Sequence, residues 1–449
     1  MKFMKSPEGR ALFVNTSLAF LGLGVILYLY YLQPVWYVYF VSEDYWAEQG
    51  TFICWFVSFC LLSWTCWRHS GFRKPVIVLL AFFSLFVALE EISWGQRMFG
   101  YTPPELFAVA NKQGEMNFHN MIPIDNDKVL VTVVVLWCIL LPLLMSIFPR
   151  LRLWCDKAGL PIIPVRIWPF LFLSSYLLLY QVLIRTNEIG ELYLGFGFTC
   201  LSLEIMLTNQ YNRAENTTHL IRSLNILLVV CLLTALSIQL FPQPDRVKWS
   251  LNRSAAIVFP QKGMFRQAET IFDHINRNPK FLVENTHFNE GIILMEMGRT
   301  AEAREVLEQS LVEQEHPQQE RPVDPEYYRK RGRILNLLER RDEANRLFDK
   351  AIELDRDRLF EVKVPATEAK VRWSLAKTLF AKGETEEALK QLLQASDITP
   401  YRKTRHRIHR WLSQWFWRNK TFLRAGEVTI DQRIEKMIRQ YLKEEKETI

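Results

Sequence analysis

Charged residues divide this chain into two halves of very different character. Residues 1–244 hold only 16 of the 55 Lys and Arg and 15 of the 48 Asp and Glu, so the last 205 positions carry 39 basic and 33 acidic residues. Charge is excluded from bilayer-spanning helices, because a charged residue at the bilayer centre costs about 2.5–3.5 kcal/mol. The asymmetry therefore excludes a single water-soluble domain and predicts a transmembrane domain, 1–244, followed by a soluble domain, 245–449.

Seven helices are expected in the transmembrane domain. Five are uncharged runs of about 18 to 32 residues, long enough to span the bilayer, between Arg10 and Glu43, Glu48 and Arg68, Lys128 and Arg150, Arg166 and Arg185, and Arg222 and Asp245. Two further apolar segments contain acids: residues 75–96 include Glu90 and Glu91, and residues 190–207 include Glu204. The expected fold class is all-α, with a polytopic helical bundle followed by a soluble helical domain.

The distribution of Lys and Arg predicts the orientation of these helices. With the N-terminus in the cytoplasm, 12 Lys and Arg fall on the cytoplasmic side, Lys128 lies at a boundary, and 3 fall outside, namely Arg97, Lys112 and Arg185. This bias agrees with the positive-inside rule. We therefore expect a protein of the bacterial inner (cytoplasmic) membrane, with a cytoplasmic N-terminus and a periplasmic C-terminal domain. The soluble domain contains no cysteine, which suits an oxidising compartment.

A short pattern of small and apolar residues recurs in the soluble domain. Its copies contain Gly263, Ala268 and Phe272; Gly298, Ala303 and Leu307; Arg341, Ala344 and Phe348; and Gly383, Ala388 and Leu392. The third copy has no glycine at its expected turn. This pattern resembles the tetratricopeptide-repeat (TPR) family, in which small residues let the two helices of a hairpin approach closely. The resemblance covers roughly residues 260–400 and implies a helical solenoid whose groove binds a peptide or a partner protein.

A basic, aromatic segment follows the repeats. Residues 401–424 interleave eight Lys and Arg with aromatic residues that include Trp411, Trp415, Phe416 and Trp417. Three interpretations remain open: a capping helix for the solenoid, a helix on anionic lipid headgroups, or a nucleic-acid contact. A periplasmic location would exclude the last of these. The expected partners are therefore membrane lipids and a protein, and no nucleic acid.

Acids gather on the expected outer side of the transmembrane domain, where eleven acids accompany three bases. Glu90 and Glu91 follow Lys74 by about 15 residues, or roughly 23 Å of helix, which places them within the outer leaflet. Adjacent carboxylates at that depth need a partner, a proton or a metal ion. Arg97 could neutralise Glu90 on a continuing helix, whereas Glu91 points about 100° away.

The sequence around these acids contains further polar residues, among them Glu115, Asn117 and His119. With the SEDYWAE segment at 42–48, this stretch resembles bacterial polytopic membrane proteins of unassigned activity. The resemblance covers about residues 40–130 and implies that one set of residues belongs together: Glu43, Asp44, Glu48, Glu90, Glu91, Trp94, Gln96, Glu115, Asn117 and His119.

Two main classes of function follow, and the sequence does not decide whether the protein is an enzyme. The first is an envelope scaffold or assembly protein that recruits partner proteins through its repeats. The alternative is a membrane-embedded, metal-dependent hydrolase or transferase acting on a lipid-linked substrate at the outer leaflet. Its candidate catalytic residues are Glu90, Glu91, Glu115 and His119. The same four residues and Glu48 are the candidate ligands of a divalent metal ion. Cation-coupled transport is a third class.

Overall fold

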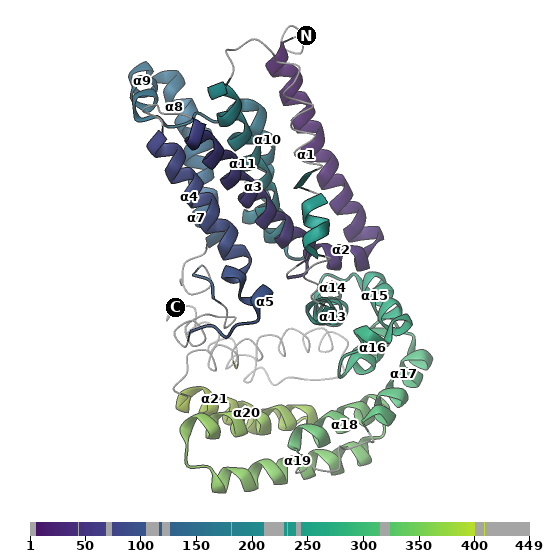
Figure 1. Cartoon of the computed structure of the whole chain (residues 1–449). Coiled ribbons are helices and arrows are strands. Elements are labelled where there is room, and N and C mark those ends of the chain that lie inside the picture. The colour runs from purple at the N-terminus through teal and green to yellow at the C-terminus, as the bar shows by residue number, and fades with distance from the viewer. Residues whose placement is uncertain are drawn as a thin grey trace. The chain divides into compact units, whose positions relative to one another are not determined.

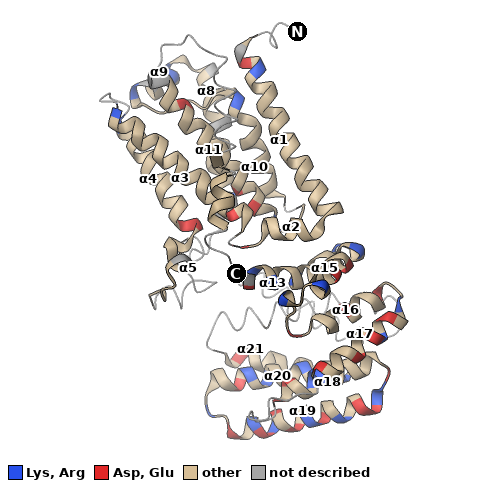
Figure 2. Ribbon diagram, turned by 45° about the vertical axis from the view of Figure 1, so that its right-hand side comes forward, with Lys and Arg blue, Asp and Glu red and all other residues tan. Residues whose placement is uncertain are grey.

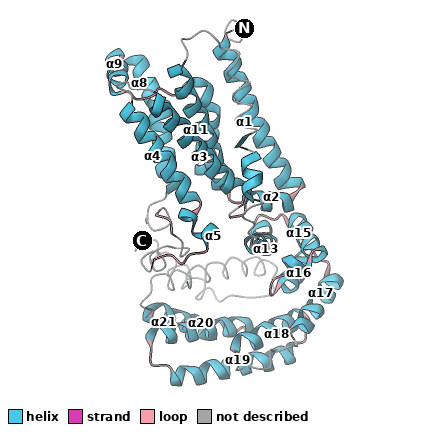
Figure 3. Ribbon diagram, viewed as in Figure 1, coloured by secondary structure: helices cyan, strands magenta, loops and turns pink. Residues whose placement is uncertain are grey.

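The computed structural model describes residues 6–43, 45–68, 74–104, 116–118, 126–180, 182–210, 229–230, 232–238, 244–314, 324–399 and 408. All regular secondary structure in these ranges is helical, in agreement with the expected all-α class (Figures 1 and 3). The chain forms two compact units, Met1–Thr286 and His287–Ile449. Charges are sparse on the apolar helices of the first unit and dense on the helices of the second (Figure 2).

Four helices in the described part of the chain are long and apolar enough to cross a membrane. They are Glu8–Leu32 within α1 (Pro7–Leu32), α3 (Trp46–Arg68), Lys128–Met145 and Thr186–Leu207. Lys128–Met145 runs through α7 (Asn126–Val134), a π-helical turn η3 (Val135–Leu140) and α8 (Leu141–Ile147), and Thr186–Leu207 lies in α11 (Thr186–Gln210). These helices indicate a membrane protein.

The other three expected spans differ from a long apolar helix. The helix α4 (Lys74–Glu91) is apolar in its middle and charged at both ends. The turn η4 (Val165–Ile167) and α10 (Trp168–Leu179) together form a shorter apolar helix. Most of residues 222–244 lies outside the described ranges, although 229–230 and 232–238 are helical. The count of seven helices, and the orientation that depends on it, therefore stays a prediction.

A proline ends the first apolar helix within its uncharged run. Gln33 leaves the helical conformation, with φ −133° and ψ 58°, and Pro34 begins a separate helix, α2 (Pro34–Val41). Proline lacks an amide N–H and clashes with the preceding turn, so it favours a break at this point. Tyr37 of α2 is fully buried, and its hydroxyl donates to the carbonyl of Ile184. The first run thus supplies one membrane-spanning helix and a second helix that packs beside the start of α11.

An ion pair stabilises the other end of α11. Glu204, which the sequence presents as a lone acid within a span, pairs with Arg166 of η4. Arg166 Nε donates to Glu204 Oε2 at 3.1 Å. Since an unpaired carboxylate is costly inside a membrane, the guanidinium explains why Glu204 is tolerated there.

The first helix pair of the predicted soluble domain packs against α2. Its first helix comprises α13 (Pro244–Arg253), η5 (Ser254–Val258) and α14 (Phe259–Gln261); its second is α15 (Phe265–Arg277), followed by η6 (Pro279–Phe281). Arg246 Nη1 donates to Glu43 Oε2 at 2.7 Å. The Tyr30 and Phe259 rings lie 5.5 Å apart, and Gln267 Nε2 donates to the Tyr31 carbonyl at 3.2 Å. These contacts place the pair in the first compact unit, beyond the boundary at 244 that charge alone suggests.

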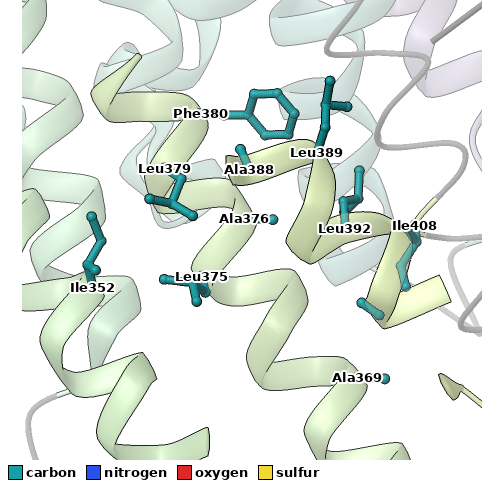
Figure 4. Close-up of a cluster of buried hydrophobic side chains, with 11 residues drawn as sticks. Ile352, Ala369, Leu375, Ala376, Leu379, Phe380, Ala388, Leu389, Leu392 and Ile408 are labelled. Carbon is teal, nitrogen blue, oxygen red and sulfur yellow. The ribbon is translucent and has the colours of Figure 1, made fainter. Parts of the chain in front are cut away.

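Three more helix pairs make up the described part of the second unit. They are α16 (Thr286–Glu296) with α17 (Thr300–Glu313), α18 (Pro325–Leu337) with α19 (Arg341–Glu361), and α20 (Pro365–Lys382) with α21 (Thr385–Ile398). Apolar residues of α20 and α21 form one core, to which Ile352 and Ile408 contribute (Figure 4).

All four pairs turn in the same way. A residue with positive φ occupies each turn: Gly263 at 73°, Gly298 at 78°, Glu339 at 64° and Gly383 at 96°. In each turn, the next residue's amide donates to a carbonyl five residues before it, as from Arg340 N to Leu335 O at 2.9 Å. Five residues after the turn residue stands a fully buried alanine: Ala268, Ala303, Ala344 or Ala388. The third pair therefore uses Glu339 where the others use glycine.

Candidate functional site

A strained polar turn follows α4 at the place where the sequence predicts a site. Ser93, Trp94 and Gly95 take φ values of 48°, 56° and 79° in succession. The left-handed conformation costs roughly 1–2 kcal/mol for a residue other than glycine. Such strain persists only where surrounding contacts impose it, and it clusters at functional sites. We call residues 90–101 together with 116–118 the α4 turn.

Both carboxylate oxygens of Glu90 hold the α4 turn in place. Glu90 is only 6% exposed. Its Oε1 accepts from the indole nitrogen of Trp94 at 2.6 Å, and its Oε2 accepts from the backbone amide of Phe118 at 2.8 Å. The ring of Phe118 also contacts the rings of Phe86 and Trp94. Glu90 thus joins the end of α4 to a segment 28 residues later in the chain.

Further hydrogen bonds connect the same two segments. Gln96 Oε1 accepts from the Met116 amide at 2.7 Å, and the buried Asn117 side chain donates to Ser93 Oγ at 3.3 Å. The Tyr101 hydroxyl donates to the Trp94 carbonyl at 3.0 Å. The resemblance over about residues 40–130 groups ten residues together. Four of them meet in the α4 turn: Glu90, Trp94, Gln96 and Asn117.

The other members of that group are distributed differently. Glu43 lies in a separate network, where it accepts from Arg185 Nη2 at 3.0 Å and from Arg246. Arg185 therefore pairs with Glu43. Glu48 lies in the first turn of α3. Asp44, Glu115, His119 and the side chain of Arg97 lie outside the described residues, so the expected approach of His119 to Glu91 stays a prediction.

Glu91 lies near a carboxylate that sequence reasoning did not assign to the site. It is half-buried, and the charges that act on it are those of Glu188, at the start of α11, and Glu90. Asn187 Nδ2 donates to Glu188 Oε1 at 3.3 Å. The available signal was topological: α4 ends and α11 begins on the same expected side of the membrane. The described residues contain no group of three His, Cys, Asp or Glu arranged to hold a metal ion, so the predicted ligand set also depends on Glu115 and His119.

An apolar cavity of about 50 Å³ lies between the apolar helices of the first unit. Its walls come from α3, α4, α7, η3, α10 and α11, and they include the aromatic side chains of Trp55, Phe83, Trp137 and Phe198. Every residue that lines the cavity is apolar. Phe83 and Glu90 are seven residues apart on α4, so they share a helix face about 10 Å apart along the axis.

Comparisons of the chain with protein-family models, with curated proteins and with solved structures give no match. Function must therefore be argued from the residues alone.

Proposed function

We propose that this protein is a scaffold or assembly protein of the bacterial inner membrane, whose helix pairs form a TPR-like solenoid that binds partner proteins. One observation carries the proposal: four successive helix pairs repeat the same turn, the same backbone hydrogen bond and the same buried alanine. Stacked helix pairs of this kind bury one another's apolar faces and leave an extended surface available for binding.

The junction between α2 and the first helix pair supports anchoring as the role of the transmembrane domain. Glu43 accepts from both Arg185 and Arg246, and so joins α2, the start of α11 and α13. A repeat held directly at the end of an apolar helix would tether the following pairs to the membrane. The bias of Lys and Arg favours the periplasmic surface. An alkaline phosphatase fused after Ile449 should then be active, and an inactive fusion would reject that orientation.

The scaffold proposal is tested by comparing two variants for rescue of a strain that lacks the protein. In Gly332→Leu, the added side chain meets Phe348, since a Cβ at Gly332 would lie 2.6 Å from Phe348 Cε1. This variant should open the α18–α19 pair and lose function. Glu91→Gln should keep the fold and the function, because a neutral amide is cheaper to bury than a carboxylate. Loss of function in Glu91→Gln with full function in Gly332→Leu would reject the scaffold.

A second function, the metal-dependent hydrolase or transferase, is favoured by the α4 turn. Strained backbone and the acids Glu90, Glu91 and Glu188 at the end of an apolar helix suit a lipid-linked substrate. In this alternative, Glu91 with Glu115 and His119, and with Glu48 or Glu90, binds a divalent cation that activates water. Elemental analysis of the purified protein tests it: a stoichiometric metal that Glu91→Gln removes would favour the enzyme.

A further inference from the structure

Charge is sorted between the two layers of helices in the last helix pairs. The first helices α18 and α20 each contain four bases and one acid. The second helices of the same two pairs show the opposite balance: α19 has five bases and seven acids, and α21 has one base and three acids. Each of these first helices therefore has a net charge of +3, and each of these second helices has a net charge of −2.

The basic helices lie side by side. Arg329 of α18 donates from Nη1 to the Ser374 carbonyl and hydroxyl of α20, at 3.3 and 3.2 Å. Lys377, one turn after Ser374, lies close enough to Arg329 and Arg333 for their charges to act on it. Lys330, Arg333 and Lys377 thus lie around the buried Arg329, whose guanidinium pairs with Glu326, and we call these four residues the basic face.

Lys377 is the most informative residue of the basic face. It is half-buried, and its Nζ lies 4.3 Å from the centroid of the Trp373 ring. Among the described residues its contact is with this ring, and no carboxylate forms an ion pair with it. Burial lowers the pKa of Lys377 and so do the charges of Arg329 and Arg333, whereas the nearby carboxylates of Glu326 and Asp355 oppose this shift. A carboxylate arriving from a ligand would offset both effects.

We propose that the basic face binds an acidic peptide segment of a partner protein. This inference rests on the scaffold function and names the class of its partner. Charge complementarity favours an acidic ligand, and Trp373 offers an aromatic surface for an apolar side chain beside the acids. Anionic lipid fits less well, because Arg329 is only 4% exposed and Lys377 is half-buried. A single extended chain can insert side chains between two helices, whereas a flat bilayer surface cannot.

The test uses the full-length protein in nanodiscs of uncharged lipid. The probe is a fluorescein-labelled peptide of about twelve residues, mostly Glu with two Phe, and its partner probe has Gln in place of Glu. Fluorescence anisotropy should show binding of the Glu peptide only, weakened by added NaCl. Arg333→Glu with Lys377→Glu should weaken binding about tenfold or more. The matched control, Arg346→Glu with Lys350→Glu, makes the same change of charge on exposed residues of α19 and should alter binding less than twofold.

Several outcomes would overturn the proposal. Equal loss in the two double variants would mean that only overall charge attracts the probe. Equal binding of the Glu and Gln peptides would remove the charge argument. Phosphatidylglycerol vesicles that bind through Arg333 and Lys377, when the Glu peptide does not, would assign the face to lipid. Circular dichroism must show equal helicity for both double variants. If the peptide fails to bind while Gly332→Leu still abolishes rescue, this proposal falls and the scaffold function stands.

Discussion

Replacing Glu339 by glycine should stabilise the α18–α19 pair. Glu339 has φ 64° in a turn whose counterparts are Gly263, Gly298 and Gly383. Its side chain is exposed and forms no hydrogen bond or ion pair with the described residues, so Glu339→Gly removes no contact. A left-handed residue other than glycine costs roughly 1–2 kcal/mol. Glycine loses about 0.5–1 kcal/mol more entropy on folding. The expected net gain is therefore about 0.5–1 kcal/mol.

Hydrogen exchange measured by mass spectrometry on the full-length protein can detect this gain. A stabilisation of about 0.5–1 kcal/mol raises protection of α18 and α19 amides by roughly two- to fivefold. Two controls isolate the backbone effect. Glu339→Ala removes the same side chain but keeps the strain, so protection should hardly change. Gly298→Ala creates the strain in the α16–α17 pair, where a Cβ meets no atom within 4 Å, and protection there should fall. Equal gains from Glu339→Gly and Glu339→Ala would refute the reasoning.

Three further predictions concern buried charges. Burial raises the pKa of Asp355 to about 6, against the opposing effects of the Ser374 hydroxyl and the Arg329 charge. Because this carboxyl ionises at a lower pH in the unfolded state than in the folded state, the free energy of unfolding of the α18–α21 region should decrease as the pH rises from about 4 to about 6. Asp355→Asn should remove that decrease of roughly 1–3 kcal/mol, which the denaturant midpoint measures. Glu204→Gln should destabilise the detergent-solubilised protein by about 3 kcal/mol, because it leaves Arg166 unpaired. The double variant Arg166→Leu with Glu204→Leu should recover most of the lost thermal stability. An unchanged melting temperature in Glu204→Gln would contradict the pairing. Glu90→Gln should speed hydrogen exchange of the Phe118 backbone amide, since the side-chain carbonyl of glutamine is a weaker acceptor than a carboxylate. The control Glu188→Gln should leave the Phe118 amide protected.

Sequence patterns predicted the features that depend on composition and local spacing. The all-α class, the long apolar helices and the helix pairs follow from charge-free runs and from recurring small residues such as Ala303 and Ala388. The same patterns also located the α4 turn, because two acids inside an apolar run are unusual. These signals need no knowledge of which segments meet in space.

Features that depend on tertiary contacts were not predictable in this way. The pairing of Arg166 with Glu204 joins residues 38 apart, and hydropathy alone treats Glu204 as unpaired. Nothing in the local sequence indicates left-handed backbone at Ser93, Trp94 or Glu339, where long-range hydrogen bonds or the stacking of helices impose it. Glu188 was missed for a similar reason, since it approaches Glu91 only when α4 and α11 come together.

Photo-crosslinking in cells tests the central claim, partner binding by the helix pairs, most directly. A benzophenone amino acid replaces Lys370, which is exposed on α20 on the same helix face as Trp373 and Lys377. In a matched control strain it replaces Glu353, which is exposed on α19. The scaffold account predicts discrete crosslinked proteins at Lys370, lost when Arg333→Glu and Lys377→Glu are added, and few at Glu353. Crosslinks absent from both positions, while the protein still rescues its deletion strain, would contradict it.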